Sequence, residues 1–185
     1  MSNADLSQMK SLTVDGVALK KLSVNGVIVW TAYKNWVPYS TEADGVTIYN
    51  GGLGYKNGYR VRSGGAEGAS TYAACTGFIP CQPGQTIRVM DASGESISTA
   101  STNCAINFSD ASRTNLGQIV GNSTGYGTCA GIGKLGDIVT FHSNNMWEYT
   151  VPSTIGDVAY VRLTVTIGNV GSTAANLIVT IDEEM

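Results

Sequence analysis

Aliphatic and polar residues alternate strictly over residues 161–167 of this 185-residue chain, and aliphatic residues return at every second position over residues 177–181. Successive side chains of a β-strand point to opposite faces, so this period predicts strands with one buried and one solvent-facing side. Aliphatic residues nowhere recur at helical spacing over three turns, and Gly, Thr, Ser and Val are too frequent for long helices. The chain is therefore expected to be all-β.

Over the last three quarters of the chain, short stretches rich in β-branched residues alternate with Gly- and Asn-rich turns. The predicted strands are 46–49, 58–62, 75–79, 85–90, 104–108, 117–120, 137–142, 147–151, 158–167 and 176–182. The predicted Gly-rich loops are 50–58, 63–70 and 121–136. Many short strands at this spacing favour a jelly-roll-like β-sandwich over residues 46–185.

The start of the chain carries a ten-residue repeat, LTVDGV at 12–17 and LSVNGV at 22–27. Asp-Gly and Asn-Gly are strong hairpin signals, because a type I′ turn needs positive φ at both central residues. The repeat predicts a β-meander with strands at 11–14, 17–24 and 27–31. A meander this small is marginal alone, so residues 1–32 are interpreted as a docking module. Residues 33–45 are interpreted as a linker.

Charged residues make up only 14% of the chain, against about 25% in a typical domain, and the net charge is −3. Such a surface suits neutral partners, and it lacks the basic patch of a nucleic-acid-binding protein. No run of about 18 apolar residues is present, so no membrane insertion is expected. The polar start has no secretory signal, which predicts synthesis in a cytoplasm.

Four cysteines stand at 75, 81, 104 and 129, with no CxxC pair and a single histidine in the chain. This set does not fit a zinc site, and no cofactor is predicted. Buried thiols are the expectation. A bridge between Cys75 and Cys81, or between Cys104 and Cys129, is the alternative.

Motifs that resemble catalytic ones lack their structural context. Residues 131–136 match G-x-G-x-x-G, but a β-rich run follows where the dinucleotide motif needs a helix. His142 has no Gly-x-Ser-x-Gly nucleophile elbow to serve. The acidic residues 182–184 are interpreted as a solvated tail. We therefore expect a non-enzymatic protein.

Two carboxylate pairs leave a glycosidase as an alternative, since that chemistry needs two carboxyl groups flanking a sugar. The pairs are Asp91 with Glu95 and Glu42 with Asp44. Roles in turns and on the surface are the favoured interpretation of these four residues.

Aromatic residues gather in or beside the predicted loops. They are Tyr39, Tyr49, Tyr55, Tyr59, Tyr72, Tyr126 and Trp147. A flat ring offers an apolar face to sugar C–H groups and keeps a polar tip for water. Tyr55, Tyr59, Tyr126 and Trp147 are the candidate glycan-stacking residues. The alternative is that such amphipathic rings are partly buried at the sandwich edges.

Several segments resemble those of bacteriophage and prophage virion proteins. Residues 22–30, LSVNGVIVW, resemble a short β motif ending in Trp near the start of such proteins. Residues 58–61 and 76–89, GYRV and TGFIPCQPGQTIRV, are similar to a run in their carbohydrate-binding-like jelly-roll domains. Residues 159–163 and 177–183 resemble the closing strands of those domains.

This resemblance implies a virion surface protein made in the host bacterial cytoplasm, of the tail-tip, receptor-binding or head-fibre type. It implies that the N-terminal meander binds other virion proteins, that the sandwich adheres to a host cell-surface glycan, and that the protein is a homotrimer. The alternative is a purely structural capsid decoration or tail protein without ligand binding. A shared fold does not dictate a shared function, so these remain expectations.

Overall fold

The structure is a computed structural model, which describes part of the chain by residue ranges. These are 13–14, 17–18, 21–24, 27–31, 35–37, 54–92, 105–120, 132–134, 138–143, 145–166 and 176–182. The all-β prediction is confirmed, since every regular element among them is a strand. No helix in this part of the chain is long and apolar enough to span a membrane.

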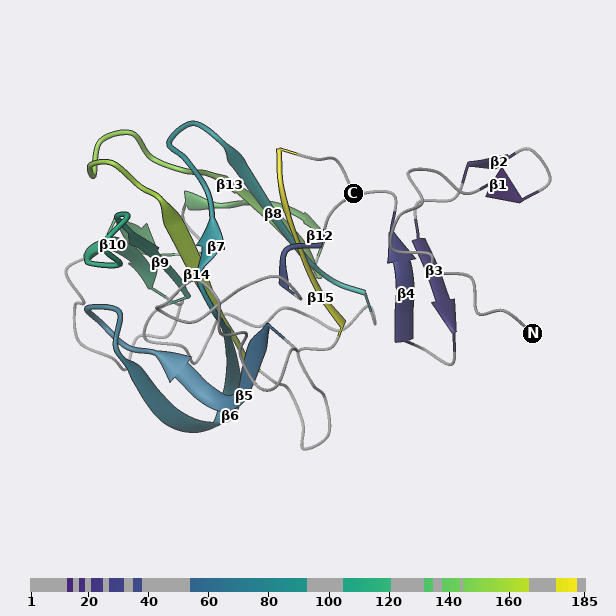
Figure 1. Ribbon diagram of the computed structural model, residues 1–185, viewed down its shortest axis with the longest axis horizontal. Helices are drawn as coiled ribbons and strands as arrows, with labels where there is room; N and C mark the ends of the chain where they lie inside the picture. Colours follow the sequence, from purple (N-terminus) through teal and green to yellow (C-terminus); the bar gives the residue numbers. More distant parts are fainter. Residues whose placement is uncertain are drawn as a thin grey trace.

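Two sheets form the main body (Figure 1). The larger has the strand order β11-β10-β9-β14-β6-β5, with β7 also paired to β14. Its strands are β5 (Tyr55–Val61), β6 (Glu67–Thr76), β7 (Ile79–Pro80), β9 (Ile106–Ser109), β10 (Asn115–Val120), β11 (Gly133–Lys134) and β14 (Tyr160–Thr166). Neighbouring strands are antiparallel except β10 and β11.

The smaller sheet has the order β12-β13-β8-β15 and is antiparallel throughout. Its strands are β8 (Thr86–Asp91), β12 (Thr140–Ser143), β13 (Met146–Thr150) and β15 (Leu177–Ile181). One apolar cluster joins the two sheets, with Phe108 and Leu163 from the larger and Val89 and Val179 from the smaller. Two sheets that share one core are consistent with a β-sandwich.

Most predicted strands agree with the observed ones, but all three predicted Gly-rich loops hold strand residues, since β11 lies inside the predicted loop 121–136. β5 begins at Tyr55 and β6 at Glu67, inside the predicted loops 50–58 and 63–70. The glycines have local reasons. Gly58 has a φ of 77° at the point where the register between β5 and β6 shifts. A Cβ at Gly68 would collide with the end of the Arg62 side chain. The predicted strand 46–49 lies outside the described residues.

The polar face of β14 is buried, whereas the sequence pattern predicts a solvent-facing side. Arg162 is 3% exposed and Thr164 is 5% exposed. Strand register places them on one face with Asn107 and Ser109 of β9 and Gln118 of β10, which are also buried. These five residues are called the buried polar layer. Alternation identifies a polar face, but it does not tell whether another element covers that face.

The turn between β5 and β6, residues 62–66, is held to this layer by hydrogen bonds. The Gly64 N–H donates to Oε1 of Gln118 at 3.1 Å, and Nε2 of Gln118 donates to Oγ of Ser63 at 2.9 Å. The N–H of Val61, just before the turn, donates to Oγ1 of Thr164 at 3.0 Å. The hairpin thereby supplies polar partners for side chains that have lost contact with water.

Arg162 is the most connected member of the layer. Its Nη2 lies 2.6 Å from Oε1 of Glu67, and its Nε and Nη2 each donate to the Thr76 carbonyl at 3.1 Å. Its guanidinium also lies 4.8 Å from the ring centroid of Phe78. The other oxygen of Glu67 pairs with Nζ of Lys56 at 3.0 Å. Glu67 thus neutralises the buried guanidinium, and the Thr76 carbonyl accepts its hydrogen bonds, as a buried charge requires.

Both repeats at the start of the chain form hairpins. β1 (Thr13–Val14) pairs with β2 (Val17–Ala18) around Asp-Gly, and β3 (Lys21–Val24) pairs with β4 (Val27–Thr31) around Asn-Gly. The pairing of Val14 with Val17 and of Val24 with Val27 agrees with the predicted hairpins. The single middle strand 17–24 is wrong, since β2 and β3 belong to separate two-stranded sheets. A ten-residue period has room for one complete hairpin per repeat.

Residues 35–37 bind the sandwich, although the sequence analysis places them in a linker. The Asn35 side chain accepts from the Val179 N–H at 3.0 Å and donates to the Leu177 carbonyl at 3.2 Å. The Trp36 N–H donates to the Val179 carbonyl at 2.8 Å, and Val37 is buried in the core. We call residues 35–37 the clasp. The folded sandwich therefore includes residues that precede the predicted boundary at 46.

Replacing Asn35 by alanine is expected to lower the free energy of unfolding by about 1–3 kcal/mol, because it leaves the Val179 N–H without its partner. Urea denaturation measures this change. The matched control is Asn57→Ala, at an exposed position of β5, for which a change within about 0.5 kcal/mol is expected. If Asn35→Ala lowers the free energy of unfolding as little as Asn57→Ala does, the hydrogen bonds of Asn35 do not stabilise the sandwich.

Candidate functional site

Two of the four aromatic residues proposed from the sequence are buried in the core. Tyr55 and Trp147 are 6% and 2% exposed and belong to the core cluster, so neither ring has a face open to a sugar. Tyr59 is 36% exposed, but Nζ of Lys56 lies 4.2 Å from its ring centroid. Tyr126 lies outside the described residues. Tyr55 and Trp147 are therefore core residues, because their strand positions turn both rings inward.

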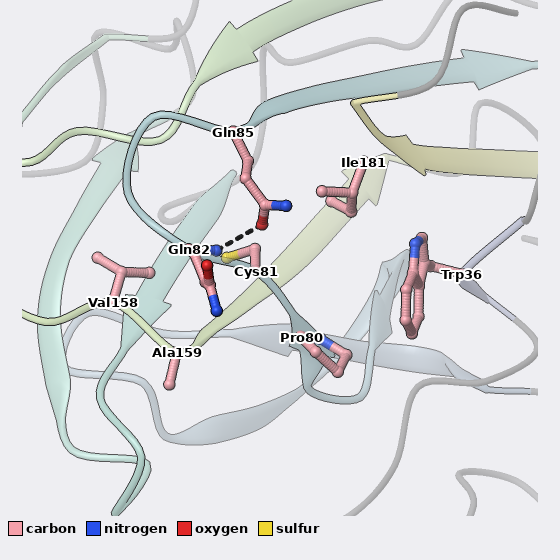
Figure 2. Close-up of a pocket in the computed structure, with 8 residues that line it drawn as sticks. All are labelled: Trp36, Pro80, Cys81, Gln82, Gln85, Val158, Ala159 and Ile181. Carbon is pink, nitrogen blue, oxygen red and sulfur yellow. Dashed lines mark hydrogen bonds between the residues drawn. The ribbon is translucent and has the colours of Figure 1, made fainter.

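A cleft of about 470 Å³ opens elsewhere on the sandwich (Figure 2). It lies where the clasp, the segment after β7, the approach to β14 and the end of β15 meet. Its lining residues are Trp36, Pro80, Cys81, Gln82, Gln85, Val158, Ala159 and Ile181. The volume is within the range of about 300–1,000 Å³ that small-molecule sites occupy.

A tight turn at residues 82–85 shapes one wall of the cleft. The Gln85 N–H donates to the Gln82 carbonyl at 3.2 Å, and Gly84 has a φ of 86°. Pro followed by Gly with positive φ is the signature of a type II turn. Because Pro and Gly fix this backbone, the wall is formed without a ligand.

The Gln85 side chain braces this turn against the end of β15. Its Oε1 accepts from the Gln82 N–H at 2.7 Å, drawn in Figure 2, and its Nε2 donates to Oδ2 of Asp182 at 2.9 Å. Oδ1 of Asp182 accepts from the Thr86 N–H at 2.7 Å. Asp182, predicted as part of a solvated tail, thus ties β15 to the start of β8. Gln85 is a structural residue of the cleft.

Two lining residues have the chemistry of ligand contacts. Gln82 is exposed, and no described residue bonds its side-chain amide. Trp36 is half-buried, with its ring at the other end of the cleft and Pro80 between the two in Figure 2. The rest of the lining includes an apolar wall, which we define as Pro80, Val158, Ala159 and Ile181.

Among the lining residues that the structure describes, none is charged. Cys81 also lines the cleft. Burial raises the pKa of its thiol to about 12, so the thiol stays neutral at physiological pH. Cys81 and Cys75 are both free and buried, which confirms the prediction of buried thiols for this pair and makes the Cys75–Cys81 bridge wrong. Cys104 and Cys129 lie outside the described residues.

The other sequence candidates occupy structural positions. Nε2 of the exposed His142 lies 3.2 Å from Oε2 of Glu148, which also accepts from Nε of Arg88 at 2.9 Å. Of the G-x-G-x-x-G segment, Gly133 and Lys134 form strand β11. The described residues contain no group of three or more His, Cys, Asp or Glu side chains suited to a metal ion.

Comparison with known proteins identifies no relative: no family model, curated protein or solved structure matches the chain. The described residues form an all-β protein whose two main sheets are consistent with a β-sandwich.

Sequence reasoning missed both Trp36 and Gln82. The Gln-Pro-Gly-Gln run predicts the turn that carries Gln82, so a search for polar residues beside rigid turns would have found it. Nothing local marks Trp36, because its position depends on the bonds between the clasp and β15, more than 140 residues away in the chain.

Proposed function

We propose that this chain is a bacteriophage virion surface protein, in which the sandwich binds a neutral host glycan and the N-terminal hairpins attach it to other virion proteins. In this proposal the protein binds without catalysis and acts as a homotrimer. The resemblance of residues 22–30 and 76–89 to virion proteins supports the setting. The single observation that carries the adhesive role is the cleft that Trp36 and Gln82 both line, with no charge on any lining residue that the structure describes.

The lining of the cleft fits the chemistry of a sugar. The ring of Trp36 offers an apolar face to pyranose C–H groups, and the Gln82 amide can both donate to and accept from hydroxyl groups. A single cleft of this kind binds weakly, and several copies in one particle raise the effective concentration of sites. A homotrimer is therefore suited to adhesion.

Replacing Trp36 by alanine is expected to reduce glycan binding at least tenfold, because stacking on the ring is lost. The measurement is a glycan array with the purified full-length chain, followed by affinity titration of the best ligand. Tyr72→Ala is the matched control, since Tyr72 is 69% exposed and lies on β6, outside the cleft. Its binding should equal that of the unchanged protein.

A folded protein that binds no glycan on the array would contradict the adhesive role. It would favour the purely structural decoration or tail protein. Loss of binding in both variants would contradict the assignment of the ligand to the Trp36 cleft.

A further inference from the structure

One part of the cleft lining, the apolar wall, has no side-chain group that can bond a sugar hydroxyl. A hexose stacked on Trp36 carries hydroxyl groups around the edge of its ring. Hydroxyls facing the apolar wall would lose water without gaining a hydrogen bond, which is costly. Val158 and Ile181 are themselves buried, so the wall is a continuation of the core surface. A ligand that fits this wall needs an apolar group beside its sugar ring.

Several backbone polar groups around the cleft are already hydrogen-bonded. The Cys81 N–H donates to the Ala159 carbonyl at 3.0 Å. The Gln82 N–H donates to Gln85, and the Gln82 carbonyl accepts from the Gln85 N–H. Among these groups, the side-chain amide of Gln82 is the one left for a ligand. An amide offers donors and an acceptor together, so its best complement is a group that also has one of each.

Charge narrows the choice further. The described part of the lining has no Arg or Lys to pair with a carboxylate or sulfate on a sugar. The nearest charged group that the bonds identify is the Asp182 carboxylate, which holds Gln85. An anionic ligand would be repelled by this like charge, though only weakly because Asp182 is exposed to water. The site therefore selects against acidic sugars.

An acetamido group satisfies all three conditions, because it is neutral, has one N–H and one C=O, and ends in a methyl group. We infer that the cleft recognises an N-acetylhexosamine, with the acetamido group between Gln82 and the apolar wall and the sugar ring on Trp36. This inference rests on the proposed glycan adhesion and deepens it.

The test compares three probes on the full-length chain by calorimetric or NMR titration: N-acetylglucosamine, glucose and glucuronic acid. We expect N-acetylglucosamine to bind roughly tenfold more tightly than glucose, since its acetamido group adds a buried methyl and a hydrogen bond. We expect no measurable binding of glucuronic acid. Thermal denaturation establishes that each protein used is folded.

The Gln82→Ala variant separates the role of this amide from that of the ring. It should bind N-acetylglucosamine more weakly than the unchanged protein does, and its preference over glucose should fall to the part that the methyl group provides. Asn57→Ala, at an exposed position of β5, is the control and should keep the full preference.

The outcomes distinguish the two proposals. If glucose or glucuronic acid binds as tightly as N-acetylglucosamine, the inference is overturned while glycan adhesion stands. If Gln82→Ala keeps the tenfold preference, the role of Gln82 is overturned. If none of these probes and no glycan on the array binds the folded protein, the proposed adhesion fails and the inference fails with it.

Discussion

Replacing Arg162 by alanine is expected to lower the free energy of unfolding by roughly 3–5 kcal/mol, the cost of removing one partner from a buried ion pair. The substitution leaves the Thr76 carbonyl without two donors and leaves Glu67 with Lys56 alone. It also opens a cavity beside Phe78. Equilibrium denaturation in urea at neutral pH measures the loss.

Arg88 provides the matched control, because it also pairs with a glutamate across neighbouring strands. Its Nε lies 2.9 Å from Oε2 of Glu148, but both side chains are partly exposed. Arg88→Ala should therefore cost less than about 1 kcal/mol. If both substitutions cost the same small amount, the buried polar layer does not hold the hairpin to the sheet.

Deleting residues 1–32 is expected to abolish incorporation of the protein into virus particles while the sandwich stays folded. Each N-terminal hairpin is a two-stranded sheet, which has little stability of its own and gains it by packing on a partner. The deletion ends before the clasp, so Asn35, Trp36 and Val37 keep their contacts. Immunoblots of purified particles measure incorporation, and circular dichroism of the purified fragment measures folding.

A second deletion, of residues 1–37, extends the first by removing the clasp. It should lower the free energy of unfolding by roughly 2–4 kcal/mol, since it removes the buried Val37 side chain and the partners of β15. Particles that incorporate the 1–32 deletion at the normal level would refute the docking role of the hairpins.

Strand positions were largely predictable from the sequence, because a period of two is local information. The alternation over 161–167 predicted β14, and Asp-Gly and Asn-Gly predicted both hairpin turns. The start of β6 was not predictable, because the stretch around Gly68 has the composition of a loop. Its place in the strand follows from its pairing with β5, where the Arg62 side chain lies beside Gly68. The buried state of Arg162 depends on a hairpin that folds over the sheet.

The candidate site was much less predictable than the fold. An aromatic residue in a strand points inward or outward according to register, which is why Tyr55 and Trp147 proved to be core residues. The cleft unites residues 36, 80–85, 158–159 and 181, which are distant in the chain. No local pattern signals such a meeting, since it is produced by the pairing of strands.

The clasp has a mechanical consequence for a protein anchored at its N-terminus and bound to a cell surface. Tension between anchor and host would enter the sandwich through residues 35–37, where three hydrogen bonds join Asn35 and Trp36 to β15. Because Trp36 also lines the cleft, the force that strips this segment from β15 would dismantle the binding site as well. Detachment would then occur at the rupture force of the clasp, before the core of the sandwich is loaded.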